Sequence, residues 1–191
     1  MCDERLKAET ATMGRLPKAP IALLSALGAA ACAGDRISHV SYDSYSRADL
    51  AYAASRGPVP VRVLGAPAAG IEPTALTDRV IEAMTGANFG TPVAYTPYAG
   101  TTASGYVMAL RFGARGDARA LCADTPPPGG IGPDYLAAFC KDGRALPYLE
   151  GAVGETNIQS ARFHNAIAGA ASQLLPIRNP ERDDCRGRRC D

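Results

Sequence analysis

The sequence predicts an α+β domain in which two main helices pack on one face of an antiparallel sheet, preceded by an N-terminal signal segment. Several short apolar runs of strand length alternate with turn residues, and two longer segments carry apolar residues at helical spacing. Helices and sequential strands in one chain of this length favour a single two-layer domain.

Residues 1–34 have the character of an export signal. Arg15 and Lys18 precede an apolar run of about a dozen residues that ends in small side chains, too short for the roughly 20 residues that span a bilayer. Acidic residues lie before Arg15, where a signal should be basic, so Met13 is a candidate for the true start.

The fate of Cys32 determines whether the chain is anchored to a membrane, and three interpretations stay open. We favour lipid attachment at Cys32, which would anchor the mature N-terminus in a membrane by acyl chains. An ordinary signal peptidase could instead cut after Ala31 or Ala33, because both follow a small-x-small pattern. The third interpretation is a short buried helix of a cytosolic protein.

The chain after the signal divides into three parts. Residues 35–57 are expected to be a linker with a short helix, because residues 46–56 are good helix formers before a stopping Gly57. Residues 58–177 are expected to form the single α+β domain, and residues 178–191 a loosely ordered tail that contains cysteines.

The domain is expected to begin with a strand over 59–64 and a helix from Pro73 to about Thr85, whose apolar residues share one face. Short extended residues at 93–95 and a central strand over 106–112 follow, and 120–124 brings Cys122 back toward the sheet. Asp142-Gly143 lies between two apolar runs, which predicts a hairpin of strands 135–140 and 144–150. The last long helix is predicted over 157–175.

Four cysteines remain if Cys32 is lipidated, and an even number in an exported chain indicates two disulfides with three connectivities. We favour Cys122–Cys140 and Cys185–Cys190, because each pair is nearest in sequence. The irregular spacing, with no histidine near either pair, argues against a zinc site, and we expect no metal and no cofactor.

The charge balance argues against a nucleic-acid partner. The chain has 20 basic and 19 acidic residues, and the part after residue 34 has equal numbers of each. Binding to phosphates would require a basic face.

No catalytic motif stands out. His39 lies in the expected linker and His164 follows a core-facing Phe163, so both are expected to be surface residues. A Gly-x-Ser-x-Gly elbow, a phosphate-binding glycine loop and His-Glu-x-x-His are absent from the sequence. Tyr95 and Tyr98 form a candidate binding surface, because tyrosine is enriched at interfaces.

The signal around Cys32, the strand over 106–112, Leu121-Cys122, Ala138-Phe139-Cys140 and the closing helix together resemble small bacterial envelope lipoproteins of uncharacterised function. The resemblance implies location and fold and carries no catalytic residues. We therefore expect a lipoprotein anchored in a membrane facing the periplasm, with a non-enzymatic binding or structural role and an envelope protein as a candidate partner. The alternatives are a soluble periplasmic small-molecule-binding protein and a hydrolase that uses His164.

Overall fold

The six strands form one mixed sheet with the order β1-β6-β5-β4-β2-β3. The computed structural model describes residues 35–42, 44–88, 90–100 and 105–183. The strands are β1 Arg36–Ser41, β2 Val59–Leu64, β3 Tyr95–Pro97, β4 Tyr106–Phe112, β5 Asp134–Lys141 and β6 Arg144–Ala152. Neighbours from β1 to β4 are antiparallel, whereas β2 runs parallel to both β4 and β3. The prediction of an α+β fold is confirmed, and that of a purely antiparallel sheet is wrong.

The parallel half of the sheet comes from a crossover. Helix α2, Pro73–Met84, leads the chain back to the end of the sheet where β2 began, so β3 starts beside Val59. The chain then enters β4 on the other side of β2 in the same direction, with Val61 opposite Met108. Strands were assigned in the sequence from their apolar pattern, and that pattern contains no information on direction.

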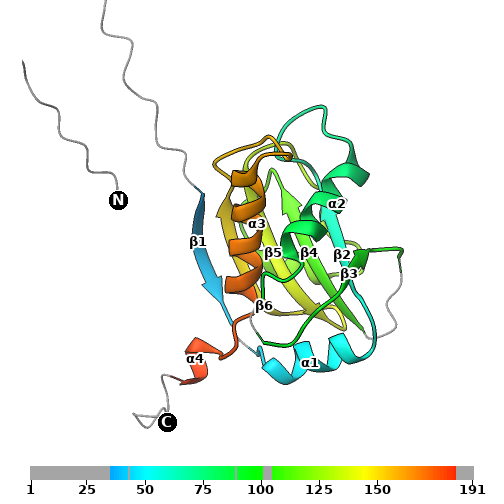
Figure 1. Ribbon diagram of the computed structural model, residues 1–191, viewed down its shortest axis with the longest axis vertical. Coiled ribbons are helices and arrows are strands. Elements are labelled where there is room, and N and C mark those ends of the chain that lie inside the picture. The colour runs from blue at the N-terminus through cyan, green and yellow to red at the C-terminus, as the bar shows by residue number, and fades with distance from the viewer. Residues whose placement is uncertain (1–34, 43, 89, 101–104, 184–191) are drawn as a thin grey trace, which may run out of the picture. The chain divides into compact units, whose positions relative to one another are not determined.

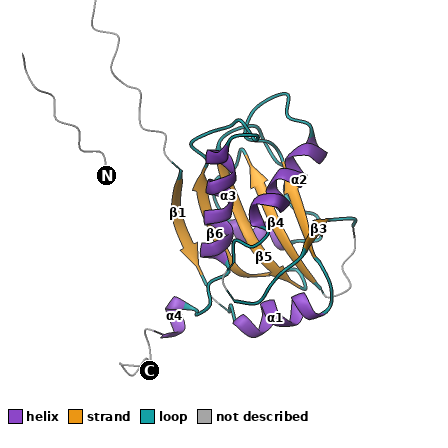
Figure 2. Ribbon diagram, viewed as in Figure 1, coloured by secondary structure: helices purple, strands orange, loops and turns teal. Residues whose placement is uncertain are grey.

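Two helices cover one face of the sheet, as predicted (Figures 1 and 2). Helix α2 buries Leu76, Val80, Ala83 and Met84. Helix α3, Ala161–Leu174, contributes Phe163, Ala166, Ile167, Ala170, Ala171 and Leu174. Both stripes match the apolar spacing of the sequence, and they join the larger of two hydrophobic clusters.

A second, smaller cluster lies on the opposite face. The 3₁₀ helix η1, Ala118–Cys122, packs there against β4 and β5. A disulfide joins Cys122 to Cys140 of β5, which confirms this predicted pair. Cys185 and Cys190 lie outside the described residues.

The segment 35–57 is part of the fold, whereas the sequence predicted a linker. Strand β1 pairs with β6, and helix α1, Arg47–Ser55, begins after Ser46, whose hydroxyl accepts a hydrogen bond from the Ala48 N–H. The predicted short helix thus exists, but it follows a strand of the sheet. Short helix α4, Pro180–Asp183, continues into the predicted tail, where Glu181 accepts a hydrogen bond from the Tyr42 N–H.

The strand register defines two ends of the sheet. At the "Arg36 end", Arg36 and Asp134 both lie opposite Ala152, and the Gly113 N–H after β4 donates to the Asp134 carbonyl. Strands β2 and β4 therefore finish where β1 starts, at the upper end of the view in Figure 1. At the "hairpin end", β2 and β4 begin and the β5–β6 turn lies at Asp142-Gly143.

Residues 1–34, in which the sequence predicts a signal segment with Met13 and Cys32, lie outside the described part of the chain. Within the described part, no helix combines the length and apolar character needed to cross a membrane.

Candidate functional site

A pocket of about 590 Å³ lies at the Arg36 end, between the β2–α2 loop and residues 129–131. Its lining is made of glycine, alanine, proline and larger aliphatic side chains: Val63, Gly65, Ala66, Ala68, Ala69, Gly70, Ile71, Pro73, Leu76, Gly129, Gly130 and Ile131. Among the described residues, no ionisable side chain lines it.

The topology explains why a pocket forms here. The connection after β2 leads to α2 on one face of the sheet, and the connection after β4 leads to η1 on the opposite face. Where neighbouring parallel strands send their connections to opposite faces, a crevice opens outside their carboxyl ends, and ligands of open α/β sheets bind in such crevices.

Residues 129–132 cross the ends of β2 and β4 and form the wall of the pocket. The Ala66 N–H donates to the Gly130 carbonyl at 2.9 Å, and the Gly130 N–H donates to the Phe112 carbonyl at 3.0 Å. A Cβ on Gly129 would lie 2.0 Å from the Gly65 nitrogen, so only glycine allows this approach. We call this arrangement the glycine crossing. The sequence indicated only turn glycines at 129–130.

The N-terminus of α2, which carries the positive end of the helix dipole, lies near the pocket and is already capped by a side chain. The Glu72 carboxylate accepts hydrogen bonds from the Thr74 hydroxyl and from the Ala75 N–H, and these lower the pKa of Glu72. An anion would compete with this carboxylate. The side chain of Ile131, 69 % exposed, lies at the rim. These features suit an apolar ligand better than a charged one.

A second pocket, of about 440 Å³, lies on the η1 face at the hairpin end and includes the Cys122–Cys140 disulfide in its wall. Its charged side chains are Arg62, Asp124 and Asp142, and of these Arg62 has partners within the fold. The Arg62 guanidinium lies 4.2 Å from the centre of the Tyr98 ring and also donates to the Ala123 carbonyl at 3.4 Å.

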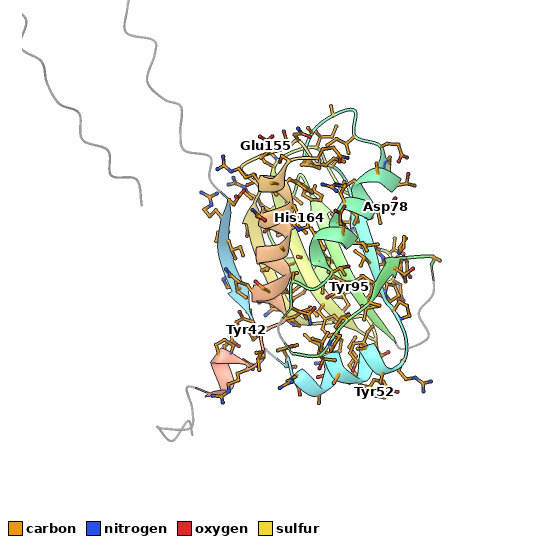
Figure 3. The ribbon with its side chains drawn as sticks, in the orientation of Figure 1. Tyr42, Tyr52, Asp78, Tyr95, Glu155 and His164 are labelled. Atoms are coloured by element: carbon orange, nitrogen blue, oxygen red, sulfur yellow. A yellow bond between two sulfur atoms is a disulfide. The ribbon has the colours of Figure 1, made fainter. Side chains whose placement is uncertain are left out.

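The candidate surface of Tyr95 and Tyr98 is divided by the sheet. Tyr95 packs against the cluster under the helices, and Tyr98 packs against the cluster under η1. The Tyr95 hydroxyl is buried without a hydrogen-bond partner among the described residues, and burial raises the pKa of this side chain. The two rings therefore do not share one surface. Tyr95, on β3, is labelled in Figure 3.

A partly buried polar cluster at the hairpin end was not predicted from the sequence. Asp49 of α1 accepts hydrogen bonds from the Tyr106 hydroxyl at 2.8 Å and from the Lys141 ammonium at 2.9 Å. The hydrogen bonds to Asp49 and Tyr106 raise the pKa of Lys141. The cluster ties α1 to β4 and to the hairpin. Its one signal in the sequence is that Lys141 is the only lysine after residue 34.

The two histidines lie apart from both pockets. His39, on the exposed edge strand β1, has its ring 5.9 Å from that of Tyr148. His164 is half-buried on α3, and its ring makes no hydrogen bond or ion pair with another described residue. The described residues also contain no group of three or more His, Cys, Asp or Glu placed to hold a metal ion.

Comparison with known proteins found no matching family model, no matching curated protein and no matching solved structure. A function for this chain therefore has to be inferred from its own residues and geometry.

Proposed function

We propose that this chain is an exported envelope lipoprotein, anchored through Cys32, whose domain binds a small apolar ligand without catalysis. The observation that carries the binding role is the uncharged pocket at the Arg36 end, because a crevice at the carboxyl ends of diverging parallel strands is where ligands of such sheets bind.

Export is supported by the Cys122–Cys140 disulfide, because disulfides form and persist in oxidising compartments such as the periplasm. Anchoring rests on the apolar segment that ends at Cys32. A soluble periplasmic binding protein is the second candidate: it would use the same pocket, and cleavage after Ala31 or Ala33 would leave it without an anchor.

The mass of the N-terminal peptide, from protein extracted from membranes of its native host, tests this proposal. A diacylglyceryl group on Cys32 is the expected result, and the variant Cys32→Ser should move the protein from the membrane fraction to the soluble fraction. A free N-terminus at Cys32 or Gly34 would favour the soluble binding protein. An intact residue 1 would contradict export.

A further inference from the structure

We infer that the pocket at the Arg36 end takes the aliphatic chain of a membrane lipid, drawn from the bilayer in which the protein is anchored. This inference rests on the proposed anchor at Cys32. It adds the chemical class of the ligand, its source and the direction from which it enters.

The connection between Cys32 and the described domain is short. Strand β1 begins at Arg36, four residues after Cys32. Since an extended chain spans at most about 3.6 Å per residue, Cys32 lies within about 14 Å of the start of β1 in any conformation. Acyl chains on Cys32 would therefore hold the Arg36 end close to the bilayer surface.

The pocket lies at the end of the sheet where β1 starts. The register places the ends of β2 and β4 at the same end of the sheet as the start of β1. Four strand spacings, about 19 Å in total, separate β1 from β2 across the sheet. The start of β1, where the proposed anchor would join the domain, and the pocket thus lie at the same end of the sheet.

The side chains that line the pocket are aliphatic and uncharged. An aliphatic chain needs no hydrogen bonds, and the backbone groups of Ala66 and Gly130 already have partners within the glycine crossing. The Ala66 N–H donates to the Gly130 carbonyl, the Gly130 N–H to the Phe112 carbonyl, and the Ala66 carbonyl accepts from the Gly132 N–H. The volume of about 590 Å³ lies within the range of small-ligand sites. The exposed Ile131 at the rim would leave water on contact with lipid.

The charges around this end favour recognition of the chain over the headgroup. Arg115 is paired with Asp134 at 2.9 Å, and Arg162 lies 3.5 Å from Asp35. Because Arg115 and Arg162 each have a carboxylate partner, an anionic headgroup gains little from these two cations. The selectivity expected is therefore mainly for aliphatic length, and Arg36, exposed at the start of β1, is the cation at this end that a headgroup could contact.

The test uses the full lipidated chain in vesicles of phosphatidylethanolamine and phosphatidylglycerol. The vesicles contain a phospholipid with a photoactivatable diazirine in its acyl chain, and mass spectrometry locates the cross-links. We expect cross-links on the peptides that contain residues 63–76 and 129–131. Ile131→Asp should lower their yield about tenfold, as expected for removing one buried aliphatic side chain from an interface.

Ile177→Asp is the matched control. Ile177 is also exposed, but it follows α3 at the hairpin end, where the Tyr45 hydroxyl donates to the Pro176 carbonyl. This variant should cross-link like the unmodified chain. Ala69→Glu, another exposed position of the lining, provides a second variant that places a carboxylate at the pocket without disturbing the core.

The possible outcomes distinguish a failure of the lipid-binding inference from a failure of the proposed anchor at Cys32. A chain that is lipidated at Cys32 and bound to vesicles, but gives no cross-links in these peptides, would overturn the inference and leave the anchor in place. Equal yields for Ile131→Asp and Ile177→Asp would overturn it as well. Cross-linking that occurs only with a free photoactivatable fatty acid in solution, by a chain without lipid on Cys32, would contradict both the anchor and the bilayer as source.

Discussion

Buried tyrosine hydroxyls connect the stability of this domain to pH. Tyr45 is 1 % exposed, and its hydroxyl donates to the Pro176 carbonyl at 3.1 Å. Burial raises the pKa of Tyr45 to about 12 from its ordinary 10.0, and it also raises the pKa of Tyr95 and Tyr135. In each case the fold favours the neutral phenol.

We therefore expect the free energy of unfolding to fall as the pH rises from 10 to 12. Over this range the unfolded chain releases the Tyr45 proton while the folded chain keeps it, so the stabilisation present below pH 10 is lost through the folded pKa. Urea unfolding at several pH values measures the decline. Tyr45→Phe should make it shallower, and an equally steep decline in that variant would contradict the assignment.

The cluster around Asp49 gives a second prediction at the residue scale. Asp49→Ala should lower the free energy of unfolding by about 1–3 kcal/mol, because the buried Tyr106 hydroxyl loses its acceptor. Lys141→Met keeps the bond between Tyr106 and Asp49 and should cost less. Chemical denaturation compares the two variants, and equal losses would show that the ammonium contributes as much as the phenol.

The glycine crossing is a feature of three backbone segments rather than of one residue. Gly129→Ala should destabilise the domain by about 2 kcal/mol, since a Cβ only 2.0 Å from the Gly65 nitrogen forces the segments apart. Gly169→Ala is the matched control, because nothing lies within 4 Å of its Cβ in α3, and it should stabilise by about 0.5–1 kcal/mol. Thermal unfolding distinguishes them, and a neutral Gly129→Ala would contradict the close approach.

The disulfide holds η1 against the sheet. Replacing both Cys122 and Cys140 by alanine should lower the stability by about 3 kcal/mol in the chain-entropy model for a separation of 18 residues. In this double variant, the rate of amide hydrogen exchange should increase in η1 before it increases in α3. The reason is that the disulfide tethers η1 to β5. Simultaneous exchange in both helices would show that the bond supports the whole domain.

Elements with a strong local pattern could be predicted from the sequence. Helices α2 and α3 carry apolar stripes, β4 is a continuous apolar run, and Asp142-Gly143 marks the hairpin. Strand β1 was missed because four of its six residues, Arg-Ile-Ser-His-Val-Ser, are polar, as an edge strand can be, and because its partner β6 is far away in sequence. Parallel pairing was missed because apolar alternation does not fix the direction of a strand.

The candidate sites could not be predicted from the sequence, because they are formed by residues that only the tertiary structure brings together. Gly65 and Gly129 look like ordinary turn residues until the sheet brings them together, and Asp49 has no local signal that connects it to Tyr106 or Lys141. The Cys122–Cys140 pair could be predicted because the two residues are near each other in sequence. Contacts between distant segments depend on topology, which is the part of the fold that local patterns specify least.

At the scale of the whole domain, the two ends of the sheet differ in character. The Arg36 end holds the uncharged pocket, and the hairpin end holds the Asp49 cluster and the pocket with Arg62. On an anchored chain, addition of lipid vesicles should slow hydrogen exchange at residues 65–70 and 129–132 and leave residues 141–144 unchanged. Protection at 141–144 instead would indicate the opposite orientation.

The pairing of β1 with β6 also sets the order in which the domain can fold. The Ser38 hydroxyl donates to the Glu150 carbonyl, 112 residues away, so the first strand to appear has its partner among the last. A chain that crosses a membrane with its N-terminus first cannot close this sheet until almost all of it has passed through. During that passage β1 has no neighbouring strand, and an unpaired strand is a site of wrong association. If the chain is exported as proposed, we therefore expect its unfolded form to depend on protection by other factors until β6 arrives.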